Sequence, residues 1–225
     1  MSKDKKRYLD YLPDKLPNNP MHIAYDWFNE ALKVKDQPNP NAMSLATMDN
    51  HRPSVRMVLC KSFVPDPGYI VIYTNYQSQK SQEISLNSNV SLVFHWDHLG
   101  KQIRIDGIAV HSPLEESDKY FNTRSQGSQI SAWGSDQSQL IESHNALKEQ
   151  IENRTTKLGL SKNKNKIKIE RPTYWGGIRI WASKIELWLE GQDRIHDRAM
   201  WTREISKNID DQFMVSNWIG CRLQP

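Results

Sequence analysis

Two arginines and a histidine occupy every second position near the C-terminal end of the chain, at Arg194, His196 and Arg198. They follow an apolar run, 185–189, and a turn sequence, so the segment 194–198 is predicted to be the return strand of a hairpin. Because side chains alternate between the faces of a strand, the three groups are expected on one face, roughly 7 Å apart. Such a face favours a phosphate or carboxylate ligand. A solvated edge strand whose charges discourage aggregation explains the pattern equally well.

Further cations and hydrogen-bond donors occur where strands and helices are expected to begin or end. Arg56 and Lys61 bound an expected strand at 54–61, and their separation places them on opposite faces unless Lys61 lies at a bend. Ser78 and Lys80 open an expected short helix, whose free N–H groups favour a phosphate. Each feature alone is ordinary surface chemistry. Together they suit more than one anionic group.

Two polar positions add possible ligands, and several common motifs are missing from the sequence. Gln102 is expected on the polar face of a strand. Gln137 and Ser138 are expected in the first turn of a long helix over 136–158, where they cap the helix first and bind ligands second. The histidines have no metal-binding spacing, and the sequence has no P-loop, Gly-rich dinucleotide motif or Gly-x-Ser-x-Gly elbow. Hydrolase and nucleotide-fold functions are therefore weakly supported, and no metal site is expected.

Composition limits the class of protein. The 225 residues are 37% hydrophobic and include eight Trp and eight Tyr, too many for a disordered chain. The net charge of +4 comes largely from two short runs, 3–7 and 162–168, so nucleic-acid binding is a minor alternative. Cys60 and Cys221 lack metal or redox spacing and suggest a reducing compartment. Without a signal peptide or an apolar run of about 20 residues, we expect a soluble, cytoplasmic protein with no membrane segment.

Periodicity predicts a mainly β chain with flanking helices. Residues 1–20 are expected to form a flexible arm, and 21–225 a single domain, since the basic linker at 161–170 is too short to argue for a second one. Close spacing of short strands favours an antiparallel barrel or sandwich. The expected strands are 42–48, 54–61, 69–74, 90–96, 102–110, 178–181 and the final hairpin. The expected helices are one that opens at Pro20 with Ile23, Trp27, Phe28, Ala31 and Leu32 on one stripe, one at 78–86, one at 113–124 behind a capping box at Ser112 with Pro113 at its first position, and one at 136–158, with a loop between Gly127 and Gly134.

The order of these pieces resembles the pyridoxamine 5′-phosphate oxidase family from about residue 20 to the end of the chain. Many short motifs in one order are more specific than any one of them. The matching motifs are 56–61, 73–75, 78–80, 101–103, 119–121, Arg124, 128–130, 132–133, 137–138, 175–177, 186–188, 194–198 and 222–225.

The resemblance implies an antiparallel FMN-binding split β-barrel that forms a homodimer, with a C-terminal dimerisation hairpin and FMN in clefts between the subunits. Carried over position by position, it implies FMN contacts at Arg56, Met57, Val58, Leu59, Cys60, Lys61, Tyr73, Thr74, Gln79, Lys80, Gln102, Gln137, Ser138, Trp188 and Arg198. It implies substrate contacts at Lys61, Tyr120, Arg124, Ser128, Arg194, Ile195 and His196. Arg194 and His196 would be the catalytic pair, which orients the substrate and handles protons.

The implied reaction is oxidation of pyridoxamine 5′-phosphate or pyridoxine 5′-phosphate to pyridoxal 5′-phosphate. A hydride moves from substrate C4′ to the flavin, and O2 reoxidises the flavin and yields H2O2. Lys61 would stabilise negative charge on the reduced ring. Two phosphorylated ligands require two cationic sites, which agrees with the residue types found above.

Three features depart from the family pattern. Gln79 stands where Arg is frequent, which predicts weaker FMN retention, and Asn39 stands where a carboxylate is common. The segment between Trp201 and Arg222 is longer than usual. Alternatives left open are a related flavoenzyme acting on another aromatic substrate, as in phenazine biosynthesis, a non-catalytic FMN- or pyridoxal-phosphate-binding protein, and a basic RNA-binding protein.

Overall fold

The structure, a computed structural model, describes residues 11–34, 37–49, 51–160, 168–209 and 212–225. The predictions for residues 1–10 and for most of the basic linker, 161–167, fall outside them. The elements in chain order are α2 (Met21–Lys33), β1 (Ala42–Met48), β2 (Pro53–Leu59), β3 (Ser62–Val64), β4 (Tyr69–Asn75), α3 (Gln79–Leu86), β5 (Asn89–Trp96), η1 (Asp97–Leu99), β6 (Lys101–His111), α4 (Leu114–Thr123), α5 (Gln126–Gly134), α6 (His144–Lys157), β7 (Trp175–Leu189), η2 (Gln192–Arg194), β8 (Asp197–Thr202), β9 (Ile205–Lys207), β10 (Phe213–Val215) and β11 (Ile219–Leu223).

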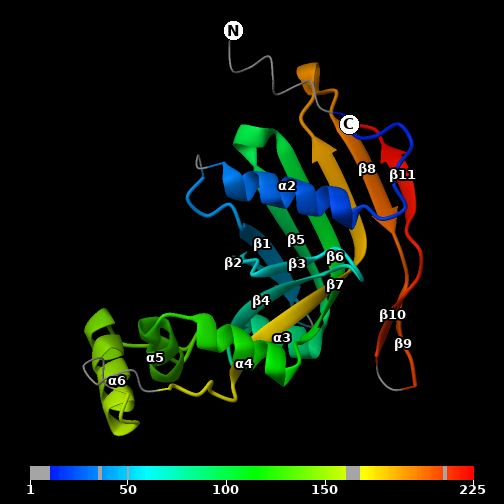
Figure 1. The fold of residues 1–225 in the computed structure, drawn as a ribbon. Coiled ribbons are helices and arrows are strands. Elements are labelled where there is room, and N and C mark those ends of the chain that lie inside the picture. The colour runs from blue at the N-terminus through cyan, green and yellow to red at the C-terminus, as the bar shows by residue number, and fades with distance from the viewer. Residues whose placement is uncertain (1–10, 35–36, 50, 161–167, 210–211) are drawn as a thin grey trace.

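One curled antiparallel sheet organises the chain (Figure 1). Its strands run in the order β11-β8-β7-β6-β5-β1-β2, and β4 pairs with both β3 and β7. The first half of β7 lies between β4 and β6, and its second half lies between β6 and β8. The predicted mainly β architecture with flanking helices is therefore confirmed, and the two expected strands at 178–181 and 185–189 are parts of one 15-residue strand.

The sheet bends where β6 and β7 change register, at Asp106 and Gly107. A Cβ atom at position 107 would overlap the carbonyl of Trp181, so only glycine allows the two strands to approach this closely. The bulge gives the sheet the local twist that a curled sheet needs.

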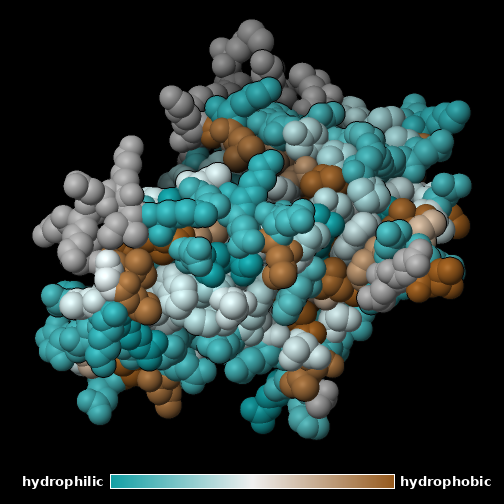
Figure 2. All heavy atoms as spheres, turned by 60° about the horizontal axis from the view of Figure 1, so that its bottom comes forward, coloured by the Kyte–Doolittle hydropathy of each residue, from teal (hydrophilic) through white to brown (hydrophobic). Residues whose placement is uncertain are grey.

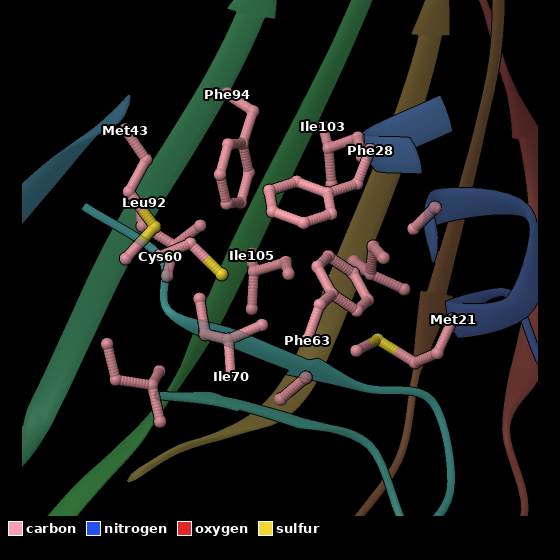
Figure 3. Close-up of a cluster of buried hydrophobic side chains, with 14 of the residues drawn as sticks. Met21, Phe28, Met43, Cys60, Phe63, Ile70, Leu92, Phe94, Ile103 and Ile105 are labelled. Atoms are coloured by element: carbon pink, nitrogen blue, oxygen red, sulfur yellow. The ribbon is translucent and has the colours of Figure 1, made fainter. Parts of the chain in front are cut away.

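Helix α2 covers one face of the sheet and completes the core (Figures 1 and 3). Its buried residues follow helical spacing, and Phe28 packs 5.5 Å from Phe63 and 5.7 Å from Phe94 between ring centroids. The predicted stripe is rotated slightly, because Leu32 is exposed and Met21 is buried instead.

The end of the molecule at the bottom of Figure 1 is mostly hydrophilic, with apolar residues in small separate groups (Figure 2).

The helical region after β6 differs from the prediction. The expected loop between Gly127 and Gly134 is helix α5, and the expected helix over 136–158 is helical only in α6. A Cβ at Gly134 would lie 2.9 Å from Ile151, so this glycine allows α5 to pack against α6 and does not end a helix by itself. Pro113, not Ser112, is the N-cap of α4, and the Ser112 hydroxyl donates instead to Glu116 at 3.0 Å.

The connection between β7 and β8 is longer than the predicted hairpin turn. Residues 190–196 lie outside both strands and include η2, with Asp193 and Arg194 at φ of 54° and 65°. Arg194 and His196 are therefore turn residues, and only Arg198 lies on a strand. The alternation rule failed here because left-handed backbone at two non-glycine positions left no sequence signal.

Residues 11–20 pack against the barrel, although the sequence predicted them to be part of a flexible arm. The side chain of Leu12 is buried, and its N–H donates to the Asp197 carboxylate at 2.7 Å. The Trp201 indole donates to the carbonyl of Pro17 at 2.9 Å, and Arg222 donates to the carbonyl of Leu12 at 2.9 Å. This segment is thus held on β8 and β11.

A buried arginine, Arg203, connects β7 to the turn between β3 and β4 at the bend of the sheet. It donates to the carbonyls of Ala182, Pro67 and Gly68 at 2.6 to 2.8 Å, and its guanidinium carbon lies 4.3 Å from the centroid of the Trp218 ring. Burial lowers the pKa of Arg203 to about 10, so the group is still charged at neutral pH. Its charge is balanced by carbonyl oxygens and an aromatic face.

Replacement of Arg203 by Met should destabilise the fold, because three buried carbonyls lose their donor. We expect a loss of about 3 kcal/mol in the free energy of unfolding, measured by urea denaturation. The exposed Arg52 is a matched control, and Arg52→Met should change the same quantity by less than about 0.5 kcal/mol. Equal effects of the two substitutions would contradict the role assigned to Arg203.

Candidate active site

A cavity of about 460 Å³ opens between β2, β4, the start of α3 and the helices α4 and α5. It brings together many of the predicted ligand residues from separate stretches of the chain. From the predicted FMN set it contains Met57, Val58, Leu59, Lys61, Tyr73, Thr74, Lys80 and Gln137, and from the predicted substrate set it contains Lys61, Tyr120, Arg124 and Ser128.

The lining holds three cations, Lys61, Lys80 and Arg124, and none of its described residues is a carboxylate. Lys80 is buried, and its ammonium group donates to the hydroxyls of Thr74 and Ser78, each at 2.9 Å. Burial, together with the charge of Arg56, lowers the pKa of Lys80 to about 8. A desolvated ammonium that contacts only hydroxyl groups is suited to an anionic ligand.

Arg124 forms a second cationic position in the same cavity. Its guanidinium lies 4.4 Å from the centroid of the Trp175 ring, and one of its buried terminal nitrogens has no hydrogen-bond partner in the part of the chain that the structure describes. Burial lowers its pKa. Ser125, the N-cap of α5, and Ser128 lie beside it with their hydroxyl oxygens 2.9 Å apart. This group offers several donors to one anion.

Aromatic rings form one wall of the cavity. Tyr73 stacks on Tyr120 with centroids 3.7 Å apart and planes 11° apart, and Trp175 continues the stack 5.8 Å from Tyr73. Burial and the nearby Glu116 carboxylate raise the pKa of Tyr73, so its hydroxyl stays protonated. The wall can therefore accept a flat ring on its face and donate a hydrogen bond at its edge.

A second cluster of predicted residues lies at the far end of β7. Gln102 on β6, Trp188 on β7 and Arg198 on β8 are direct neighbours across three strands. The His196 ring lies 4.6 Å from the Trp188 ring, and its Nδ1 accepts a hydrogen bond from the N–H of Gly191 at 3.2 Å. Nε2 therefore carries the ring proton and can donate.

The two clusters are far apart within one chain. Trp175 lines the cavity at one end of β7, and Trp188 stands near the other end, roughly 40 Å away along the strand. In Figure 1 the helices α4 and α5 lie at the bottom and the connection between β7 and β8 lies at the top. One small ligand cannot contact both clusters of the same chain.

Several predicted ligand residues are absent from the cavity lining. Arg56 forms an ion pair with Glu83 at 2.8 Å, and Gln79 donates to the other oxygen of that carboxylate, also at 2.8 Å. The Cys60 side chain lies in the core, where burial raises its pKa to about 12. Apart from the second cluster, the other predicted residues outside the lining are Ser138, which has a φ of 74°, and the exposed Arg194 and Ile195.

Sequence reasoning also missed residues that line the cavity. Trp175 was recognised only as part of a motif, and Ser125 was hidden because the helix it caps was expected to be a loop. The cap position of Ser125, three residues before Ser128, is the signal that could have found it. Lys61 lies just beyond the end of β2. The sequence analysis required such a position if Lys61 and Arg56 were to contact the same ligand.

Neither a metal site nor a membrane-spanning helix occurs among the residues that the structure describes. No group of His, Cys, Asp and Glu side chains within the described ranges is arranged to hold a metal ion. Among those same residues no helix has the length and apolar character to cross a membrane.

Comparison with known proteins gives consistent matches. The family described as "Pyridoxamine 5′-phosphate oxidase" matches residues 31–157, and the "Pyridoxine 5′-phosphate oxidase C-terminal dimerisation region" matches residues 175–225. Pyridoxine/pyridoxamine 5′-phosphate oxidase of Anaplasma phagocytophilum is 42% identical over 94% of this chain and 95% of its own, and that of Paraburkholderia phytofirmans is 40% identical over 93% and 91%.

Two solved structures share the fold. PhzG from Burkholderia lata, in complex with tetrahydrophenazine-1-carboxylic acid, has a TM-score of 0.80 at 25% identity and covers 97% of this chain and 100% of its own. A pyridoxamine 5′-phosphate oxidase-related, FMN binding protein from Nostoc punctiforme has a TM-score of 0.65 at 13% identity over 92% and 98%. The sequence matches over nearly the whole length show that this chain belongs to the pyridoxamine 5′-phosphate oxidase family.

Proposed function

We propose that this protein oxidises pyridoxamine 5′-phosphate and pyridoxine 5′-phosphate to pyridoxal 5′-phosphate, with FMN as its flavin and O2 as the electron acceptor. Relatives that are 40–42% identical over most of the chain carry the name of this activity. The observation that carries the proposal is the cavity with three cations, no carboxylate in its described lining, and a flat aromatic wall. Such a cavity suits phosphorylated planar rings.

The two cationic positions divide naturally between two phosphates. Lys80 and the start of α3 would hold the phosphate of FMN, with Thr74 and Gln137 nearby. Arg124, Ser128 and Tyr120 would hold the phosphate of the substrate. FMN, when bound, supplies the redox chemistry by taking a hydride from the substrate and passing the electrons to O2, which becomes H2O2. The protein's own contribution is to hold both rings in register and to exclude water.

A second copy of the chain would complete the site. Gln102, Trp188, His196 and Arg198 cannot reach the cavity of their own chain, and the match to a dimerisation region supports a homodimer. Val55, Met57 and Leu59 expose 69%, 62% and 39% of their surface on β2, and the last two also line the cavity. An apolar strand face beside the cavity is where a second chain would dock.

In this arrangement Arg194 and His196 come from the second copy. Both lie in the turn between β7 and β8, where an exposed guanidinium and the Nε2–H of the imidazole can reach a substrate. Their proposed work is to orient the pyridine ring and to hold or move a proton beside C4′. Residues 21–225 would act as one domain, and the cysteine usage favours the cytoplasm.

A related oxidase acting on another aromatic substrate is the second candidate. The TM-score of 0.80 with PhzG and the similar motif at 78–80 favour it. The identity of 25% to that protein against 40–42% to the vitamin oxidases favours the first proposal.

The first test is oxygen consumption by the purified protein with added FMN. Pyridoxamine 5′-phosphate should be oxidised with release of H2O2, and pyridoxamine without phosphate should be a poor substrate. Arg124→Ala should raise KM for the phosphorylated amine about 100-fold with little change in FMN affinity, because one charged contact is lost. The exposed Arg52→Ala is the control. Turnover of a tetrahydrophenazine carboxylic acid, with none of the vitamers, would favour the second candidate instead.

The affinity for FMN should fall as the pH rises above about 8. Lys80 in the free protein has a pKa of about 8, so above that pH an anion binds only if the side chain takes up a proton. The Kd should then rise by up to about tenfold per pH unit between pH 8 and 9.5. Lys80→Arg stays charged and should remove this dependence, whereas Lys80→Met should weaken binding about 100-fold at pH 7. A flat Kd in the wild-type protein would contradict the role of Lys80.

Mixed dimers test whether the site is shared between two chains. Arg124→Ala and His196→Ala should each be nearly inactive, but unfolding and refolding them together should restore about a quarter of wild-type activity, because half of the dimers gain one intact site of two. The control pair, Arg124→Ala with Lys61→Ala, alters the same half-site and should restore nothing. Equal recovery from both pairs would contradict the shared site.

A further inference from the structure

Glu186 is a buried carboxylate beside the second cluster, and the proposed oxidation gives it no role. It belongs to the motif 186–188, of which only Trp188 was expected to contact a ligand. It lies on β7 opposite Arg104 of β6 and Met200 of β8, and its side chain is only 6% exposed. A buried carboxylate requires partners for its charge, and here both partners are arginines.

The two carboxylate oxygens of Glu186 bind different arginines. Oε1 accepts from Nε and Nη2 of Arg198, at 3.0 and 2.8 Å, and Oε2 accepts from Nη1 of Arg104 at 3.1 Å. Arg198 stands two residues before Met200 on β8, so its long side chain reaches Glu186 across the diagonal of the strand pair. Two guanidinium groups and one carboxylate leave the cluster with one positive charge in excess, which favours an anionic ligand.

These contacts fix the Arg198 side chain without using all of its donors. Its remaining nitrogen, Nη1, donates to the carbonyl of Gln224 at 2.9 Å, so all three nitrogens are held. A guanidinium has five N–H groups, and the other two, on the terminal nitrogens, make no hydrogen bond to the residues that the structure describes. Since 25% of the Arg198 side chain is exposed, a ligand can reach them.

We propose that Glu186 is a positioning residue for FMN, which holds the guanidinium of Arg198 in the orientation that contacts the cofactor. The inference rests on the proposed function, in which Arg198 of one copy contacts FMN in the cavity of the other. Without the carboxylate, Arg198 keeps its charge but loses two of its three hydrogen bonds. Its side chain must then be ordered when FMN binds, which weakens binding. Glu186 acts only through Arg198 and does not touch FMN itself.

The test is a double-mutant cycle in which the Kd for FMN is measured by the quenching of flavin fluorescence. Glu186→Gln and Arg198→Gln should each raise this Kd about tenfold. The double variant should bind FMN no more weakly than Arg198→Gln alone, because Glu186 then has nothing to position. Two independent losses would instead multiply to about a hundredfold.

A matched control is the carboxylate of Asp106, which lies on β6 two residues after Arg104 and therefore on the same face of the sheet. It accepts from Ser91 at 2.7 Å and lies 3.6 Å from the Lys184 ammonium. Asp106→Asn should change the Kd for FMN by less than about twofold. Circular dichroism shows whether each variant is folded. If Glu186→Gln does not fold, Glu186→Asp keeps the charge on a shorter side chain and should raise the Kd at least about threefold.

The possible results separate this role from the proposed oxidation. Wild-type affinity in the Glu186 variants, or a hundredfold loss in the double variant, would overturn the inference and leave the oxidase function standing. A wild-type protein that does not bind FMN would overturn both. Because the cycle measures binding, it still decides the role of Glu186 if FMN binds and the vitamers are not oxidised.

Discussion

The length of strand β7 sets the distance between the two clusters of predicted ligand residues in one chain. β7 pairs with β4 and β6 over its first half and with β6 and β8 over its second half, so its extended geometry is fixed by neighbours on both sides. The cavity lies at its start, and the cluster around Trp188 lies near its end. Since the rise of a strand cannot be shortened, the chain separates two groups that the proposed chemistry needs together. Under the proposed function, dimerisation would then follow from strand geometry, because a second copy turned about a twofold axis would supply each cavity with the missing groups.

In the free protein, the two buried cations of the cavity are destabilised by their surroundings. Lys80 is buried among hydroxyl groups, and Arg124 lies over an aromatic ring with one nitrogen unpartnered among the described residues. Both pKa values are lowered by burial, so the charged forms are less stable here than in water. An anion that displaces the remaining water recovers part of this free energy. These buried cations favour an anionic ligand. The rest of the barrel, including the Arg203 contacts at the bend, compensates for the lower stability of the site.

Alternation along single strands was enough to predict the mainly β fold, because each strand buries one face and the signal is local. The helices near the cavity were harder. Gly134 was taken for a loop residue, yet its missing side chain is explained by a contact with Ile151 that only the folded chain reveals. Asp193 and Arg194 adopt a left-handed backbone although neither is glycine, so the sequence did not indicate this turn. The order of the motifs identified most of the cavity lining. No periodicity in the sequence could show that the predicted ligand residues divide between this cavity and a second cluster around Trp188. That division depends on the length and pairing of β7.

The glutamine at position 79 shows how a departure from the family pattern can be understood from its neighbours. Gln79 donates to one oxygen of Glu83, and Arg56 donates to the other. Burial opposes ionisation of Glu83, but hydrogen bonds from Thr47, Gln79 and Arg56 outweigh it and lower its pKa, so the carboxylate is charged. Arg56 and Glu83 then nearly cancel, and a neutral residue at 79 leaves Lys80 as the main positive charge at the start of α3. The substitution therefore concentrates the proposed recognition of the FMN phosphate on one ammonium group, whose own charge depends on pH near 8. The weaker FMN retention that the sequence predicts would follow from this concentration of charge and would not require any loss of shape in the cavity.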